Sequence, residues 1–192
     1  MPNLNLQKLE FKKTPFQDLI ISNPKIFSDE RGYFYESYNS RLFQEFAGFS
    51  PNFVQDNQSK STYGVLRGLH FQNGEYAQSK LVRVLEGEVL DVVVDLRKSE
   101  PTYGKTFSIK LSAKNKKQLF IPKGMAHGFI TLSPTAIFTY KCDAYYNKES
   151  ERGLAYNDND LNIDWLVDVK DIILSQKDLE NPNFKELKNI SF

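Results

Sequence analysis

The feature that most constrains this chain is a two-residue alternation of side-chain character, which recurs in several segments. In residues 87–96, GEVLDVVVDL, one set of alternate positions is wholly aliphatic and the other alternates valine with aspartate. Residues 107–111 and 136–146 show the same period. Successive side chains of a β-strand point to opposite faces, so the pattern predicts strands, and it predicts one apolar face for 87–96.

Turn signals separate these segments at short intervals. They lie at Asn73-Gly74, Glu86-Gly87, Pro101–Gly104, Lys123-Gly124 and Ser133-Pro134. Short strands divided in this way are typical of an antiparallel sandwich or barrel. Helix signals are scarce: one short helix is expected from near Ser40 to Gly48, and a second around Asp178 to Leu187. The sequence contains no repeat, low-complexity tract or linker. We therefore expect a mainly β fold over residues 1–192, as one closed domain with short terminal helices.

Composition excludes several functional classes. The formal net charge is +1, from 25 basic and 24 acidic residues, so no overall field favours nucleic acid or an anionic membrane. There is no apolar run long enough to cross a bilayer, and Met1 is followed by polar residues, which predicts a soluble, cytoplasmic protein. The single cysteine, Cys142, excludes an intramolecular disulfide and a cysteine-based zinc site.

The chain has only two histidines, and each lies in an apolar segment that contains glycine. His70 lies in GVLRGLHFQ, residues 64–72, and His127 lies in IPKGMAHGFI, residues 121–130. Two such segments in a β-barrel suggest either a metal site or acid–base chemistry at the mouth of the barrel.

The metal alternative is only half supported by the spacing. Barrels of the cupin type often bind a metal through two histidines two residues apart, a carboxylate, and a third histidine in a Pro-x-Gly-x-x-His segment. Pro122, Gly124 and His127 fit the second segment, but Gln72 stands where the second ligand of the first segment would be. Two imidazoles alone rarely hold a transition metal tightly, so we expect no metal. An imidazole has an ordinary pKa near ~6.5, which makes His70 a candidate general base.

A series of further motifs occurs in a defined order along the chain. They are 29–36 (DERGYFYE), 55–59 (QDNQS), 65–72 (VLRGLHFQ), 78–84 (QSKLVRV), 87–95, 101–104 (PTYG), 118–128 (QLFIPKGMAHG), 140–146 and 174–178 (LSQKD). From about residue 15 to about residue 182, this pattern resembles the dTDP-4-dehydrorhamnose 3,5-epimerase family. The resemblance implies a homodimeric, cupin-fold isomerase without metal or cofactor. It also implies conversion of dTDP-4-dehydro-6-deoxy-D-glucose into dTDP-4-dehydro-L-rhamnose, a step in dTDP-L-rhamnose biosynthesis.

The resemblance assigns catalytic roles to four residues. Both C3 and C5 of a 4-keto sugar lie next to the ketone, so a base can remove their protons if the enolate is stabilised, and an acid must return a proton to the other face. By resemblance the base is His70, which Asp178 orients. The acid is Tyr140, a phenol that is protonated at neutral pH. Lys80 matches the lysine beside the ketone and would stabilise the enolate oxygen.

Substrate-binding residues also follow from the resemblance. Arg31 and Arg67 match positions that contact the substrate, Arg31 from the other subunit, and guanidinium groups suit a diphosphate. His127 would line the same cavity. Hydrogen-bonding or stacking contacts with the nucleotide are expected from Glu36, Gln55, Asn57, Tyr33 and Tyr145.

Three alternatives remain open on the sequence. Relatives on this fold include enzymes that epimerise only C3 or only C5 of a related nucleotide 4-keto sugar. A metal-dependent cupin enzyme would need a bound metal, and Gln72 argues against it. A non-catalytic sugar-binding barrel would not need the combination of His70, Asp178 and Tyr140.

Overall fold

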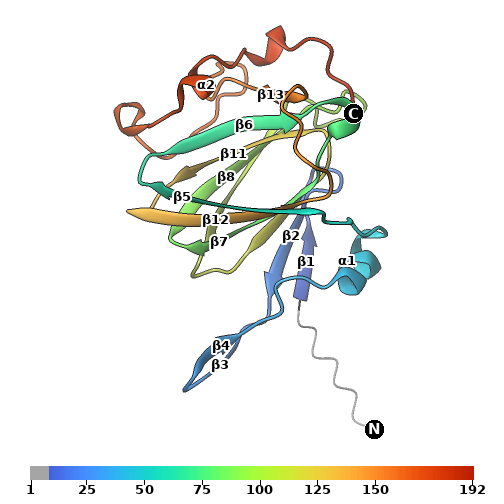
Figure 1. The fold of residues 1–192 in the computed structure, drawn as a ribbon, viewed down its shortest axis with the longest axis vertical. Coiled ribbons are helices and arrows are strands. Elements are labelled where there is room, and N and C mark those ends of the chain that lie inside the picture. Colours follow the sequence, from blue (N-terminus) through green and yellow to red (C-terminus); the bar gives the residue numbers. More distant parts are fainter. Residues whose placement is uncertain (1–8) are drawn as a thin grey trace.

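The computed structural model describes residues 9–192, which form two facing antiparallel sheets and a small protruding hairpin (Figure 1). In order across the first sheet, its strands are β1 (Leu9–Lys13), β2 (Ile20–Pro24), β10 (Gln118–Ile121), β7 (Lys80–Glu86), β12 (Thr135–Cys142) and β5 (Gln55–Thr62). Those of the second are β13 (Glu151–Gly153), β6 (Leu66–Gln72), β11 (Met125–Thr131), β8 (Glu88–Asp95) and β9 (Thr106–Ser112). The hairpin pairs β3 (Phe27–Asp29) with β4 (Gly32–Phe34). The mainly β prediction is confirmed, although the strands of residues 9–192 form two separate sheets rather than one closed ring.

The main core lies between the two sheets. Val82 of β7 and Phe138 of β12 pack there against Val93 of β8 and Phe129 of β11. Phe129 and Phe138 stack with ring centroids 4.1 Å apart. Side chains of both sheets thus share one apolar interior, as the alternating pattern requires.

The predicted apolar face of β8 is confirmed, but the face that carries the aspartates is buried as well. Val92 and the other aliphatic residues on its outer face pack against Leu154 and Trp165 of the chain that follows β13. The inner face is equally closed, since Asp91 and Asp95 are both 0% exposed. Asp95 is paired with Arg97 at 2.7 Å. The long C-terminal segment, red in Figure 1, covers the outer face of this sheet.

The first helix is confirmed and the second is shorter than expected. Helix α1 (Ser40–Ala47) begins after Asn39, whose side chain accepts a hydrogen bond from the Leu42 amide, and ends at Gly48 with a φ of 84°. Helix α2 (Gln176–Leu179) is a single turn, and a separate 3-10 turn follows at Phe184–Glu186. Pro182 lies between them and cannot donate a backbone hydrogen bond, which prevents one continuous helix.

Strand β12 ends earlier than the sequence pattern predicts. The alternation runs to residue 146, but pairing stops at Cys142. The next residue, Asp143, turns away to accept hydrogen bonds from the Ser79 amide at 2.7 Å and the Ser79 hydroxyl at 2.5 Å. Among residues 9–192, no helix is long and apolar enough to span a membrane.

Candidate active site

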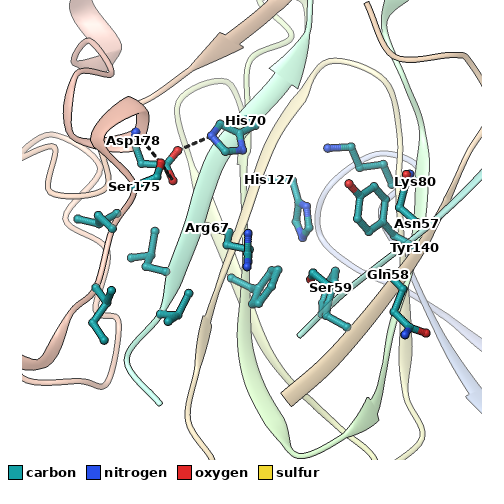
Figure 2. A pocket seen from close by; sticks show the side chains of 16 residues that line it. Asn57, Gln58, Ser59, Arg67, His70, Lys80, His127, Tyr140, Ser175 and Asp178 are labelled. Atoms are coloured by element: carbon teal, nitrogen blue, oxygen red, sulfur yellow. Dashed lines mark hydrogen bonds and ion pairs between the residues drawn. The ribbon is translucent and has the colours of Figure 1, made fainter. Parts of the chain in front are cut away.

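One cavity lies between the two sheets, with a volume of about 520 Å³. Its walls come from both sheets and from the C-terminal segment near α2 (Figure 2). The lining residues are Asn57, Gln58, Ser59, Val65, Leu66, Arg67, His70, Lys80, His127, Phe129, Phe138, Tyr140, Ile173, Leu174, Ser175 and Asp178. The cavity therefore contains all four predicted catalytic residues.

His70 and Asp178 form a hydrogen-bonded pair at one side of the cavity. His70 Nε2 lies 2.5 Å from Asp178 Oδ1, although 108 residues separate them in sequence. Ser175, the residue before α2, donates its hydroxyl to Asp178 Oδ2 at 2.8 Å. Burial opposes ionisation of Asp178, but hydrogen bonds from His70 and Ser175 outweigh it, so the pKa of this carboxyl is lowered. The pair thus consists of a buried carboxylate and an imidazole whose side chain is 29% exposed.

Two glycines bring the two histidines close together. His70 on β6 and His127 on β11 are partners in the sheet register, and a β-bulge follows His127. A Cβ on Gly68 would lie 2.6 Å from the Gly128 Cα, and one on Gly128 would lie 2.8 Å from the Arg67 carbonyl oxygen. Both distances are too short for any side chain, so β6 and β11 can approach this closely only with glycine at both positions. This explains the glycines beside each histidine in the sequence.

Tyr140 and Lys80 lie on the other sheet and face the pair formed by His70 and Asp178. Figure 2 shows them on the opposite side of the cavity from His70 and Asp178. Lys80 Nζ lies 5.9 Å from the centre of the Tyr140 ring. Burial raises the pKa of the Tyr140 hydroxyl and lowers the pKa of the Lys80 ammonium. The raised pKa keeps the phenol protonated at neutral pH, whereas the lysine amine lies in a poorly solvated place that disfavours its charged form.

A second histidine–carboxylate pair joins His127, which lines the cavity, to Asp91, which does not. His127 Nε2 is 2.9 Å from Asp91 Oδ2, and Asp91 is fully buried on β8. Burial raises the pKa of Asp91 against the attraction of His127 and Lys80. The sequence interpretation did not include Asp91 in the site. Its signal was an acidic residue within a run of valines, a place where an unpaired carboxylate is costly.

Three of the predicted binding residues, Asn57, Arg67 and His127, line the cavity, and two others, Gln55 and Tyr145, lie outside it. Asn57 and Arg67 line the cavity, and Arg67 Nε donates to the Ser61 hydroxyl at 3.1 Å. Gln55 donates to the Asn57 side chain at 3.0 Å but does not itself line the cavity. Tyr145 is 69% exposed in the loop after β12.

The remaining predicted binding residues do not reach the cavity of their own chain. Arg31 lies in the turn of the β3–β4 hairpin, with its side chain 83% exposed and paired with Asp29 at 2.5 Å. Tyr33 is 60% exposed on the same hairpin. Glu36 accepts a hydrogen bond from the Asn39 side chain at 2.8 Å. The hairpin extends away from the two sheets in Figure 1.

Gln72, which replaces a possible metal ligand, has a structural contact. Its side-chain oxygen accepts a hydrogen bond from the Asn147 amide at 3.1 Å. Within the part of the chain that the structure describes, no three His, Cys, Asp or Glu side chains gather as a metal site would require. Each histidine has a carboxylate partner, which is Asp178 for His70 and Asp91 for His127.

In a fold of two β-sheets, the cavity sets a histidine–carboxylate pair opposite a tyrosine and a lysine, an arrangement that suits acid–base chemistry. A family model described as dTDP-4-dehydrorhamnose 3,5-epimerase matches residues 13–186. The dTDP-4-dehydrorhamnose 3,5-epimerase of Shigella flexneri is 53% identical over 172 residues, which are 90% of this chain and 94% of that protein. The chain belongs to the dTDP-4-dehydrorhamnose 3,5-epimerase family and is an isomerase.

Solved structures of relatives have the same fold. The crystal structure of the dTDP-4-dehydrorhamnose 3,5-epimerase from Elizabethkingia anophelis is similar with a TM-score of 0.90 and 55% identity, over 93% of this chain and 98% of that one. The dTDP-6-deoxy-D-glucose-3,5-epimerase from Legionella pneumophila was solved in complex with dTDP-4-keto-L-rhamnose. Its TM-score is 0.89 at 46% identity, over 94% of this chain and 95% of that one. The predicted family, cupin-type fold and enzyme class are confirmed.

Proposed function

We propose that this chain converts dTDP-4-dehydro-6-deoxy-D-glucose into dTDP-4-dehydro-L-rhamnose by inverting C3 and C5 through proton transfer. The observation that carries the proposal is the opposition of His70, with its Asp178 partner, to Tyr140 across one cavity. The Legionella relative, solved with dTDP-4-keto-L-rhamnose, supports a nucleotide 4-keto sugar as the ligand.

The reaction begins with removal of a proton from the carbon next to the ketone. The imidazole of His70 accepts this proton and becomes a cation, while the C–H electron pair moves into the enolate. Asp178, whose pKa is lowered, remains ionised and stabilises the cation at Nε2. The negative charge that develops on the ketone oxygen is stabilised by the Lys80 ammonium in its poorly solvated position.

The second half returns a proton to the opposite face of the same carbon. Tyr140 is on the other sheet, so it approaches the ring from the side away from His70. Its hydroxyl protonates the enolate carbon. The His70 imidazolium then releases its proton to solvent and the Tyr140 phenolate takes one up, which returns the site to its starting state. The same groups act on C3 and on C5 once the sugar turns in the cavity.

The nucleotide end of the substrate would extend towards the polar side of the cavity. Arg67 and Asn57 supply a cation and an amide there. We propose that the active form is a homodimer in which Arg31 and the exposed aromatic rings of one hairpin serve the cavity of the other subunit. Support comes from the position of Arg31 and Tyr33, which lie on a protruding hairpin outside their own cavity. We also propose that the chain is a single domain that acts in the cytoplasm.

The test is proton NMR of the 4-keto substrate incubated with the protein in deuterated water. We expect deuterium at both C3 and C5 with the natural chain, unaffected by chelator, and none with His70→Asn. Deuterium at one carbon alone would identify a mono-epimerase, and loss of exchange with chelator would favour a metal-dependent enzyme. Binding without exchange at either carbon would reject the proposed reaction. Circular dichroism of His70→Asn controls for its folding.

A further inference from the structure

Asp91 is a buried carboxylate that has few partners of its own. It lies on the inner face of β8 and is fully buried in a run of valines. The other carboxylate of this face, Asp95, is bonded to Arg97 at 2.7 Å and to the Thr102 hydroxyl at 2.6 Å. By contrast, Asp91 Oδ2 is bonded to His127, and Oδ1 has no hydrogen-bond partner among residues 9–192. Burial of a carboxylate in this way is costly, which points to a use at the site rather than in stability.

The bond to Asp91 occupies one of the two ring nitrogens of His127. His127 Nε2 lies 2.9 Å from Asp91 Oδ2, and the ring is stacked with Phe138 at an interplanar angle of 24°. An ionised carboxylate can only accept hydrogen bonds, so it holds the imidazole proton on Nε2. In the neutral ring, Nδ1 is then an acceptor only. Because His127 lines the cavity, Nδ1 suits a sugar hydroxyl and not a ketone oxygen.

Asp91 also affects the charge of Lys80. Burial lowers the pKa of the Lys80 amine. Negative charges at Cys142, Asp91 and Glu151 act in the opposite direction. The Cys142 thiol is neutral at pH 7, because burial raises its pKa to about 11. At neutral pH the two carboxylates are therefore the groups that favour the ammonium. The effect is mutual, since burial raises the pKa of Asp91 and the attraction of His127 and Lys80 opposes that rise.

We propose that Asp91 is a positioning residue for the reaction: it keeps the His127 proton on Nε2, so that Nδ1 can accept from a sugar hydroxyl, and its charge keeps Lys80 an ammonium. The inference rests on the proposed function, in which that ammonium stabilises the enolate oxygen. Asp91 does not line the cavity and acts through these two residues. The other titratable or charged groups around them are Arg67 and His70 on β6, Tyr140 and Cys142 on β12, Glu151 on β13 and Asp178 on α2.

The first test is heteronuclear NMR of the imidazole nitrogens. The chain has two histidines, so in His70→Asn every imidazole signal belongs to His127. We expect the proton on Nε2 at neutral pH in this variant. Addition of Asp91→Asn should make the Nδ1–H form appear, because an amide can donate a hydrogen bond to Nε2. A proton on Nδ1 while Asp91 is intact would overturn the inference. The measurement needs no turnover, so its outcome is independent of the proposed function.

The second test is the pH dependence of deuterium exchange. In the otherwise natural chain, Asp91→Asn should lower kcat/KM roughly 10- to 100-fold, because both contacts with the substrate are impaired. The basic limb of the kcat profile should move to lower pH by roughly half a unit to one unit. The reason is that Lys80 loses a nearby negative charge and releases its proton more readily. A basic limb that stayed in place would overturn the inference.

Asp95→Asn is the matched control. It removes the same charge from the same face of the same strand, and Asp95 does not line the cavity. Stability in urea should fall because Arg97 loses its partner, but the His127 tautomer and the basic limb should stay unchanged. Equal changes in both variants would show a general loosening of β8 and reject the role of Asp91. Exchange by the natural chain tests the proposed function separately. If Asp91→Asn does not fold, the tautomer of His127 in His70→Asn still decides.

Discussion

At the scale of single residues, burial favours the neutral form on both sides of the cavity, but only Tyr140 keeps a raised pKa. The pKa of Tyr140 rises because its neutral form is favoured away from water, which keeps the acid protonated. Asp178 resists the same effect because His70 and Ser175 donate hydrogen bonds to its charged form. A protonated phenol and an ionised carboxylate beside an imidazole can therefore coexist at one pH, which is what the proposed inversion of a carbon requires.

Tyr140→Phe should separate proton exchange from inversion. The variant keeps His70 and Lys80, so a proton can still leave and return on the His70 face. It has no acid on the other face, so net epimerisation should fall about 10²- to 10⁴-fold. The measurement is deuterium incorporation by NMR, set beside the amount of inverted product. If exchange and inversion declined together, His70 would not act as an independent base.

Asp178→Asn should make stability less dependent on pH. A carboxyl whose pKa is lowered in the folded state contributes stability above its unfolded pKa of about 3.9, and this contribution disappears as pH falls through the lower folded value. Urea unfolding at pH 7 should show a loss of about 1.5–3 kcal/mol in the variant. The difference should shrink towards pH 3. A difference that stayed constant over this range would contradict the assignment.

At the scale of elements, the contact between β6 and β11 controls the placement of both histidines. Gly68 and Gly32 offer a matched comparison, because their φ angles are 120° and 122°. A Cβ on Gly32 would meet nothing within 4 Å, whereas one on Gly68 would meet backbone at 2.6 Å. The two positions thus share the same backbone preference and differ in steric crowding.

Gly68→Ala should destabilise the protein more than Gly32→Ala. The shared backbone strain should cost about 1–3 kcal/mol in each variant. Pushing β6 away from β11 should add roughly 1–3 kcal/mol for Gly68→Ala and lower kcat through displacement of His70. Thermal or urea unfolding measures the first effect, and deuterium exchange measures the second. Equal losses in the two variants would show that β6 can move without cost.

The sequence predicts elements well where the pattern is local. The strand alternation of β8 and β12 and the boundaries of α1, from Asn39 to Gly48, depend on neighbouring residues, and the structure confirms them. The features that the sequence pattern does not predict come from tertiary contacts. The outer face of β8 is covered by the distant C-terminal chain, and β12 stops at Cys142 because Asp143 turns to Ser79. These contacts join residues that are distant in the sequence, so a local alternation of side chains cannot predict them.

The residues of the site likewise fall into those that the sequence predicts and those that only tertiary contacts reveal. The pairing of His70 with Asp178 was predicted from family resemblance, and the structure places the two side chains in contact. Asp91 was missed because its partner, His127, belongs to another strand. The role of Arg31 stays a prediction, because its proposed cavity belongs to a second subunit.

At the scale of the whole molecule, the proposed dimer leads to a complementation experiment. Arg31→Ala should lower kcat/KM roughly 10- to 100-fold through loss of a charged contact with the diphosphate. His70→Asn should be inactive for a different reason. If the hairpin of one subunit serves the cavity of the other, mixed dimers contain one cavity with both residues intact.

Co-refolding the two variants should therefore restore activity that neither has alone. Activity is measured by deuterium exchange at the concentrations used for each variant separately. Sedimentation of the mixture checks that dimers have formed. A mixture with only the summed residual activities would place Arg31 in the same cavity as the His70 of its own chain, or in none.

His70 and Asp178 are far apart in the sequence, so they are made at different times during synthesis of the chain. All strands of both sheets are present once the chain reaches Gly153, but Asp178 follows 25 residues later and 108 residues after His70. Domains fold as the chain emerges from the ribosome, N-terminal part first. A nascent chain can thus assemble its two sheets while its base still lacks the partner that orients it. If the proposed mechanism holds, proton exchange should appear only after the segment that carries Asp178 has been made.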